Sequence, residues 1–305
     1  MGIFDDNEGM MELPDSDIDY ITHNAYANLS DIKVFDNTMM NTYRTCPRLF
    51  YWSILRGFEP RKKSAALAFG GAWHEFLEHY LMGEGLEDSL QKAITFFLAE
   101  DVSDLKRNIT TLTTLANLYN ERFTMLEWEV LGTEVLGIVP IADFLYGAKI
   151  DAVVKTNEGV KGVEHKTSSM MKARYFDMFR MSSQCRGYYF VLKNQMHEVK
   201  GLVLNVAHIV KKPDFYREHL RWSTAQIEDW LLTTINTRAA MLQSQESGIW
   251  QQNANSCCTM YGNCPMMDSC LDPRPYTEVI PNHSEFRPRK WEPFHDTIKE
   301  SKGEK

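Results

Sequence analysis

The chain has 305 residues, of which 44% are hydrophobic and 24% are charged, and this composition is ordinary for a globular protein with one large domain or two small ones. It contains no apolar run long enough to span a bilayer, and its acidic start, MGIFDDNEGM, lacks the basic and apolar regions of a signal peptide. Without these features we expect a cytoplasmic protein that has no membrane partner. The net charge of −8 argues against general binding of nucleic acid but leaves room for a local basic groove.

The first part of the chain predicts an arm followed by helices. Residues 1–36 are acidic and poorly periodic, so we expect a flexible arm. An aromatic-rich helix is predicted over 38–56, in which Pro47 either kinks the helix or marks a first turn. Further helices are predicted over 65–82, which contains His74, over 86–100 and over 104–127.

The second part of the chain predicts mainly strands. Hydrophobic residues change to a period of two at residue 129, which predicts three or four strands up to residue 167. The order of helices, then strands, then a helix and more strands indicates a mixed α/β core with helices packed around it. The remaining segments are a helix over 174–194, strands over 197–210 and 214–222, a helix over 224–246, a cysteine-rich loop over 257–270 and a polar tail over 283–305.

The segment from 147 to 169 carries the clearest candidate for chemistry. Two alternating runs, separated by turn-forming residues, predict a β-hairpin. Because side chains at i and i+2 of a strand share a face, Glu164 and Lys166 project together, and Asp151 comes from the paired strand. Two carboxylates and an amine suit metal-assisted hydrolysis of a phosphodiester, since a hard divalent cation prefers oxygen ligands and activates a bound water. A surface hairpin with these residue types is the alternative, because such short motifs match many unrelated sequences.

The six cysteines are unevenly placed, and four of them lie within 257–270. In a cytosolic chain such clustering indicates a metal site rather than disulfides. The close C-x2-4-C pairs of zinc sites are absent from the sequence, and widely spaced cysteines with a distant fourth fit an iron–sulphur cluster better. Buried free thiols are the alternative. Cys46 is either a core residue or the fourth ligand, and we expect Cys185 to be a core residue.

Six segments in one order resemble the PD-(D/E)XK nuclease superfamily, in particular its RecB-type exonuclease branch with iron–sulphur members such as the AddB nuclease domain, the CRISPR-associated exonucleases and stand-alone phage exonucleases. The resemblance implies a restriction-endonuclease-like α/β fold: a mixed β-sheet core flanked by helices, with an N-terminal helical region and a C-terminal cysteine-cluster loop. The nuclease domain would span 37–282. The segments are NTYRTCPRLFYW, FGGAWHEFLEHY, GAKIDAVV, GVEHKTSS, QCRGYYF and CCTMYGNCPMMDSC.

The resemblance also implies a metal centre for Mg²⁺ or Mn²⁺. Its ligands would be the side chains of His74, Asp151 and Glu164 and the backbone carbonyl of His165. Lys166 would orient the attacking water and offset developing negative charge. His74 by itself would be an ordinary core or surface residue of an amphipathic helix, so its role depends on the resemblance.

Two further sets of residues match motifs of this branch. Gln184 and Tyr188 match a Q-x3-Y motif whose residues contact DNA and steady the active site, and their spacing puts them on one helix face. The implied ligands of a structural 4Fe-4S cluster are Cys46, Cys258, Cys264 and Cys270, with Cys257 as a competing ligand.

Together these expectations describe a metal-dependent DNA exonuclease that acts in recombination, repair or phage DNA processing, on single-stranded or end-containing DNA. The sequence has no Walker A motif, so the protein would act alone or be fed by a helicase or recombination partner. The sequence does not indicate whether the protein forms a homo-oligomer. The alternatives are a catalytically idle or partner-activated DNA-binding member of the same fold, a zinc-stabilised interaction module and a site-specific endonuclease.

Overall fold

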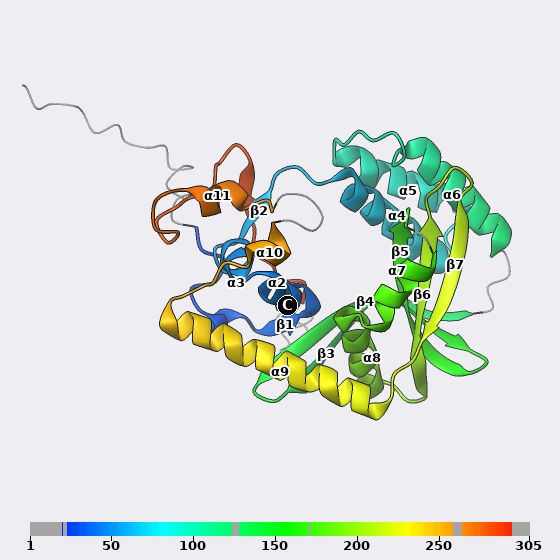
Figure 1. The fold of residues 1–305 in the computed structure, drawn as a ribbon. Coiled ribbons are helices and arrows are strands. Elements are labelled where there is room, and N and C mark those ends of the chain that lie inside the picture. The colour runs from blue at the N-terminus through cyan, green and yellow to red at the C-terminus, as the bar shows by residue number, and fades with distance from the viewer. Residues whose placement is uncertain (1–19, 21–22, 124–127, 171, 259–263, 295–305) are drawn as a thin grey trace, which may run out of the picture.

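The computed structural model describes Tyr20 and residues 23–123, 128–170, 172–258 and 264–294. Its centre is a mixed sheet of six strands flanked by helices, and a second sheet has two short strands (Figure 1). This architecture confirms the predicted α/β class with a mixed sheet. The main sheet contains β1 (Val34–Asp36), β3 (Glu129–Ile141), β4 (Phe144–Thr156), β5 (Gly159–Ser168), β6 (Val199–His208) and β7 (Asp214–Leu220), and the small sheet pairs β2 (Phe58–Pro60) with β8 (Phe286–Pro288).

The pairing along β4 creates an opening in the sheet. β3 pairs with β4 over almost its whole length, so β1 and β5 share the other edge of β4. β1 runs parallel to residues 145–147 of β4, and β5 runs antiparallel to residues 152–156. Residues 148–151 therefore lie between these two partners. Beyond β5 the sheet continues with β6, which is parallel to β5, and with β7, which is antiparallel to β6.

The predicted helices are present, but two of them are each divided into shorter helices. The helix expected over 38–56 is broken at Cys46, whose extended backbone (φ −163°) ends one helix, and Pro47 begins the next. The helix expected over 174–194 is broken before Ser182, whose side chain caps the second part by accepting from the Cys185 N–H. No helix within the described residues is long and apolar enough to cross a membrane. The helices are η1 (Leu29–Asp31), α2 (Asn37–Thr45), α3 (Pro47–Phe50), the π-helix η2 (Tyr51–Leu55), α4 (Ala65–Leu81), α5 (Leu86–Ala99), α6 (Ile109–Arg122), α7 (Lys172–Arg180), α8 (Ser183–Gln195), α9 (Thr224–Ser247), α10 (Ala254–Cys257) and α11 (Met267–Leu271).

Helices cover both faces of the main sheet. On one face α4 and α6 pack against the sheet and α5 packs against α4 (Figure 1), and Trp73 and Tyr119 are fully buried there beside Phe215. On the other face α8 packs between the sheet and α9, with Val191 and Leu192 buried. Each large apolar side chain buried in these layers contributes about 1.5–3 kcal/mol to stability. The two helical layers thereby fix the position of the opening beside residues 148–151 of β4.

The prediction of a flexible arm over 1–36 is wrong for residues 23–36. These residues form η1 and β1, and Tyr26, Leu29 and Phe35 are buried in the main core. The chain is held here because Asp36 caps α2 by accepting from the Met39 N–H at 2.8 Å, and because burial of apolar side chains outweighs the local acidic composition. Residues 1–19, 21 and 22, which include the most acidic part of the expected arm, lie outside the described residues.

The prediction of a polar tail over 283–305 is wrong for its first half. β8 pairs with β2, and Phe294 is buried against Gly147 of β4. The indole N–H of Trp291 donates to Oδ2 of Asp36 at 2.8 Å, so the end of the chain is tied to the start of the sheet. Residues 295–305 lie outside the described residues.

Candidate metal centre

Asp151 lies where β4 and β5 separate. The last paired residues of the two strands are Ala152 and Val163. Beyond this pair, Oδ2 of Asp151 accepts a hydrogen bond from the backbone N–H of His165 at 2.6 Å. The carboxylate thus takes the place of a strand partner, and its second oxygen, Oδ1, faces His74 at 3.6 Å from Nδ1.

Glu164 and Lys166 lie on one face of β5, as the alternation predicted. The ammonium of Lys166 forms an ion pair with Oε1 of Glu164, whose side chain is 1% exposed. Oε2 of Glu164 is buried and has no hydrogen-bond partner among the described residues. Because an unpartnered buried carboxylate oxygen is costly, this atom has the environment of a ligand for a cation.

His74 reaches the same place from α4. The helix begins at the cap Ser64, which accepts from the Leu67 N–H at 3.3 Å, and the burial of Trp73 fixes its rotation. Nε2 of His74 lies 2.9 Å from the carbonyl oxygen of His165. This contact is a hydrogen bond that holds the imidazole beside Asp151, and both its nitrogen and the carbonyl oxygen are atoms that would hold a divalent cation.

His165 contributes its backbone to this centre and its ring to the opposite side of the sheet. Nδ2 of Asn205 donates to Nδ1 of the His165 ring at 3.0 Å, and Arg217 donates to Oδ1 of Asn205 at 3.2 Å. Burial lowers the pKa of His165 well below its usual value, so the ring is neutral. The buried contact with Asn205 holds the strand whose N–H and C=O face Asp151 and His74.

The electrostatic environment favours a bound cation. Burial raises the pKa of Asp151 to about 7, although the charge of Lys166 opposes this. Burial, together with the charge of Asp151, raises the pKa of Glu164 to about 7. Burial and the charge of Lys166 lower the pKa of His74, which leaves a neutral imidazole as a ligand requires. Two adjacent buried acids that resist ionisation are stabilised as carboxylates by a divalent cation, so the residues present fit Mg²⁺ or Mn²⁺.

Glu134, which no sequence motif singled out, belongs to the same group in the structure. One ligand atom each of His74, Glu134 and Asp151 lies within 4.8 Å of the other two. Glu134 lies on β3, between residues that pair with Ile150 and Ala152, and is therefore opposite Asp151. An acidic residue within the predicted strand segment was the only available signal, because the register of β3 against β4 is not visible in the sequence.

Gln184 and Tyr188 meet as their spacing predicted. Nε2 of Gln184 donates to the phenolic oxygen of Tyr188 at 2.9 Å on α8. Burial and the charges of Glu164 and Asp151 raise the pKa of Tyr188 well above its usual value, so its phenol stays protonated beside the carboxylates. Cys185, between them in sequence, is fully buried in the core, as expected.

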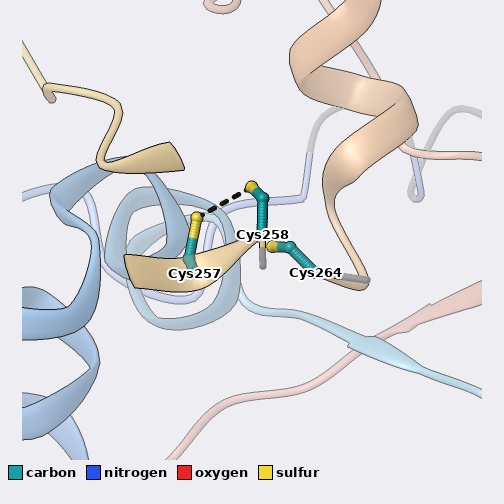
Figure 2. A group of neighbouring side chains, drawn as sticks. All are labelled: Cys257, Cys258 and Cys264. Carbon is teal, nitrogen blue, oxygen red and sulfur yellow. Dashed lines mark hydrogen bonds between the residues drawn. The ribbon is translucent and has the colours of Figure 1, made fainter. Parts of the chain in front are cut away.

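The clustered cysteines form a second candidate site. Cys257, Cys258 and Cys264 place their sulfur atoms within 4.8 Å of one another, and Figure 2 shows the thiols of Cys257 and Cys258 pointing toward each other at 3.1 Å. Cys46 lies beside this group, because its thiol interacts with that of Cys257, and its sulfur also accepts from the Asn253 N–H at 3.3 Å.

Cys270 belongs to the same neighbourhood. Burial raises the pKa of the Cys270 thiol, and the nearby Cys46 and Cys258 add to this effect. Soft thiolates from segments far apart in the sequence suit an iron–sulphur cluster or zinc. The structure therefore groups Cys257, Cys258 and Cys264, with Cys46 and Cys270 near them, and residues 259–263 within the loop lie outside the described residues.

Comparisons with known proteins show a family match and a shared fold. A family model described as the PD-(D/E)XK nuclease superfamily matches residues 38–271, a range that contains the candidate metal centre and the clustered cysteines. A solved structure from Eubacterium rectale, named as a candidate exonuclease, is similar with a TM-score of 0.52 and 12% identity and covers 87% of this chain and 94% of its own. The structure of LHK-Exo in complex with dAMP has a TM-score of 0.27 and 12% identity and covers 60% of this chain and 96% of its own. A search of the curated proteins returned no match.

Proposed function

The chain belongs to the PD-(D/E)XK nuclease superfamily, and on this premise we propose that it is a metal-dependent DNA exonuclease that hydrolyses phosphodiester bonds. The observation that carries the proposal is the opening between β4 and β5, where Asp151, Glu164 and Lys166 meet His74 from α4. This grouping unites the residue types that metal-assisted hydrolysis of a phosphodiester needs.

In the proposed mechanism one set of residues binds the metal and Lys166 acts on the water and the phosphate. His74, Asp151, Glu164 and the carbonyl of His165 would hold Mg²⁺ or Mn²⁺. The bound cation would supply a water of lowered pKa and neutralise charge on the phosphate. Lys166 orients the attacking water and offsets the negative charge that develops on the phosphate oxygens. Its ammonium remains charged because Glu164 and Asp151 raise its pKa more than burial lowers it.

We propose that the DNA strand passes a cavity beyond the end of β5. A cavity of about 590 Å³ lies where β5 and β6 end, close to the start of α6. Its lysines and hydroxyl groups suit contacts with a phosphate backbone, which supports a nucleic-acid strand as the substrate. The lining includes Lys106, Thr110, Thr111, Thr114, Ser169 and Lys211.

The exonuclease assignment rests on the resemblance to the RecB-type branch and on the Gln184–Tyr188 pair, which we propose contacts DNA and steadies the site. We also propose that a structural 4Fe-4S cluster binds to Cys46, Cys258, Cys264 and Cys270, because these thiols lie together with Cys257. In this account the nuclease domain includes residues 23–36 and 283–294 in addition to the expected 37–282, and it acts in the cytoplasm, alone or fed by a helicase.

A catalytically idle or partner-activated DNA-binding protein of the same fold is the alternative function. Incubation of the purified protein with end-labelled linear and circular DNA, with Mg²⁺, Mn²⁺ or EDTA, separates the two. Metal-dependent loss of linear DNA alone supports the exonuclease. Binding without any cleavage supports the alternative.

A further inference from the structure

Glu134 has a backbone conformation that is unusual for its place in the fold. It lies in the interior of β3 but has φ +49°, in the left-handed region. Its neighbours Thr133 and Val135 remain paired with β4, so the strand continues on both sides of this residue. For a side chain other than glycine the left-handed conformation costs about 1–2 kcal/mol, and such strain persists where the surrounding structure imposes it.

The strained backbone directs the Glu134 carboxylate toward the candidate metal centre. One of its oxygens lies within 4.8 Å of ligand atoms of both His74 and Asp151. The three side chains come from β3, α4 and β4, so tertiary structure rather than one local turn brings them together.

The ion pair of Glu134 does not explain the strain. Oε2 of Glu134 contacts the ammonium of Lys149, whose side chain is 51% exposed. Exposed ion pairs of this kind typically contribute about 0–1 kcal/mol, which is less than the cost of the left-handed backbone. Coordination of a cation by the Glu134 carboxylate would offset that cost.

An independent observation points to a cation at the same place. Oε2 of Glu164, on a side chain with 1% exposure, has no hydrogen-bond partner among the described residues. The charges of Asp151 and His74 both act on Glu164, so this carboxylate lies near the group of His74, Glu134 and Asp151. The centre therefore contains an available buried carboxylate oxygen beside the Glu134 group.

We propose that Glu134 is a further carboxylate ligand of the divalent-cation centre and that the left-handed backbone at this position places it there. The inference rests on the proposed function, in which His74 and Asp151 bind the same cation. A third carboxylate adds negative charge and a hard oxygen ligand, and both favour Mg²⁺ or Mn²⁺ over softer ions.

The test is titration of Mn²⁺ into the full-length protein, followed by calorimetry or by the EPR signal of free Mn²⁺. Glu134→Gln keeps the size and the strained backbone but removes the charge, and we expect the affinity for Mn²⁺ to fall by roughly 10- to 100-fold. Glu134→Gly should show the same loss of affinity but a higher melting temperature without metal than Glu134→Gln, because glycine adopts φ +49° freely.

Glu198→Gly is the matched control. Glu198 also has a left-handed backbone, φ +59°, but it is exposed and directly precedes β6, beside the start of β5 and away from the candidate metal centre. This variant should keep the parental affinity for Mn²⁺ while its melting temperature rises, which separates relief of strain from loss of a ligand.

Asp151→Asn separates failure of this inference from failure of the proposed function. Loss of Mn²⁺ binding in Asp151→Asn with parental affinity in Glu134→Gln would overturn the role of Glu134 and leave the metal centre in place. Parental affinity in both variants would overturn the metal centre itself. Loss in both supports the inference.

Discussion

Oδ2 of Asp151 accepts a hydrogen bond of 2.6 Å from the backbone N–H of His165, across the point where β4 and β5 part. The carboxylate is oriented by the backbone of the strand that carries Glu164 and Lys166, so this strand segment fixes the position of candidate ligands from both strands. The carbonyl of the same residue, His165, lies 2.9 Å from Nε2 of His74. One peptide segment therefore positions ligands from both β4 and α4.

The first prediction concerns the stability of the metal-free protein. Because the folded-state pKa of Asp151 is about 7 and an unfolded aspartate titrates near 4, the folded state holds an extra proton between these values. Stability should therefore fall as pH rises from about 4 to 7. Asp151→Asn removes this loss, and at pH 8 it should raise the free energy of unfolding by on the order of 2 kcal/mol.

Urea denaturation at pH 5 and pH 8, with EDTA present, measures this effect. The difference between Asp151→Asn and the parent should shrink at pH 5, where both side chains are neutral. An Asp151→Asn protein that is less stable than the parent at pH 8 would show that the carboxylate serves the fold rather than a ligand.

The second prediction concerns the cysteine cluster. The protein purified without oxygen should absorb near 400 nm, and Cys264→Ala should lose this absorption and melt at a lower temperature, because cluster binding stabilises the fold. Cys185→Ala is the control, since this buried thiol lies in a different core. Cys257→Ala should keep the colour if Cys258 is the ligand. A colourless parent that contains zinc would contradict the iron–sulphur assignment.

The third prediction concerns the cavity beyond β5. Lys211→Ala should weaken binding of single-stranded DNA and should reduce the slope of log affinity against log salt by about 0.7, the value for one lost phosphate contact. Lys200→Ala, an exposed lysine at the other end of β6, is the control and should leave the slope unchanged. Equal slopes for Lys211→Ala and the parent would exclude this cavity from the DNA path.

The fourth prediction concerns the contact between Trp291, which follows β8, and Asp36, the last residue of β1. Trp291→Phe keeps an aromatic side chain but removes the indole N–H that donates to buried Asp36, so it should lower the free energy of unfolding by about 1–3 kcal/mol. Denaturant titration measures the change. No loss of stability would mean that the segment after β8 adds little to the fold.

The local parts of the fold were predictable, because hydrophobic periodicity is a property of the sequence. The β4–β5 hairpin and the shared face of Glu164 and Lys166 follow from a period of two, and the meeting of Gln184 with Tyr188 follows from helical spacing. The roles of these residues and of His74 stay predictions, since their grouping alone does not measure catalysis.

The remaining features depend on contacts between distant segments. The acidic composition of 1–36 gave no indication of β1, whose place in the sheet is set by β4. The polar composition of 283–305 gave no indication of the contact between Trp291 and Asp36. Glu134 was not identified because its direction depends on a left-handed residue inside a strand, which no periodic pattern encodes. The two breaks in the predicted helices arise from single residues, Pro47 and the cap Ser182.

The most direct test of the account is a nuclease assay on end-labelled linear and circular DNA with the anaerobically purified parent and Lys166→Ala. We predict metal-dependent degradation of linear DNA by the parent, no degradation of circular DNA, and no activity with EDTA. Lys166→Ala should keep the fold and the absorption near 400 nm but lose cleavage, because the ammonium acts on the water and the phosphate. Full activity in Lys166→Ala, or an inactive parent with an intact cluster and bound Mn²⁺, would contradict the account.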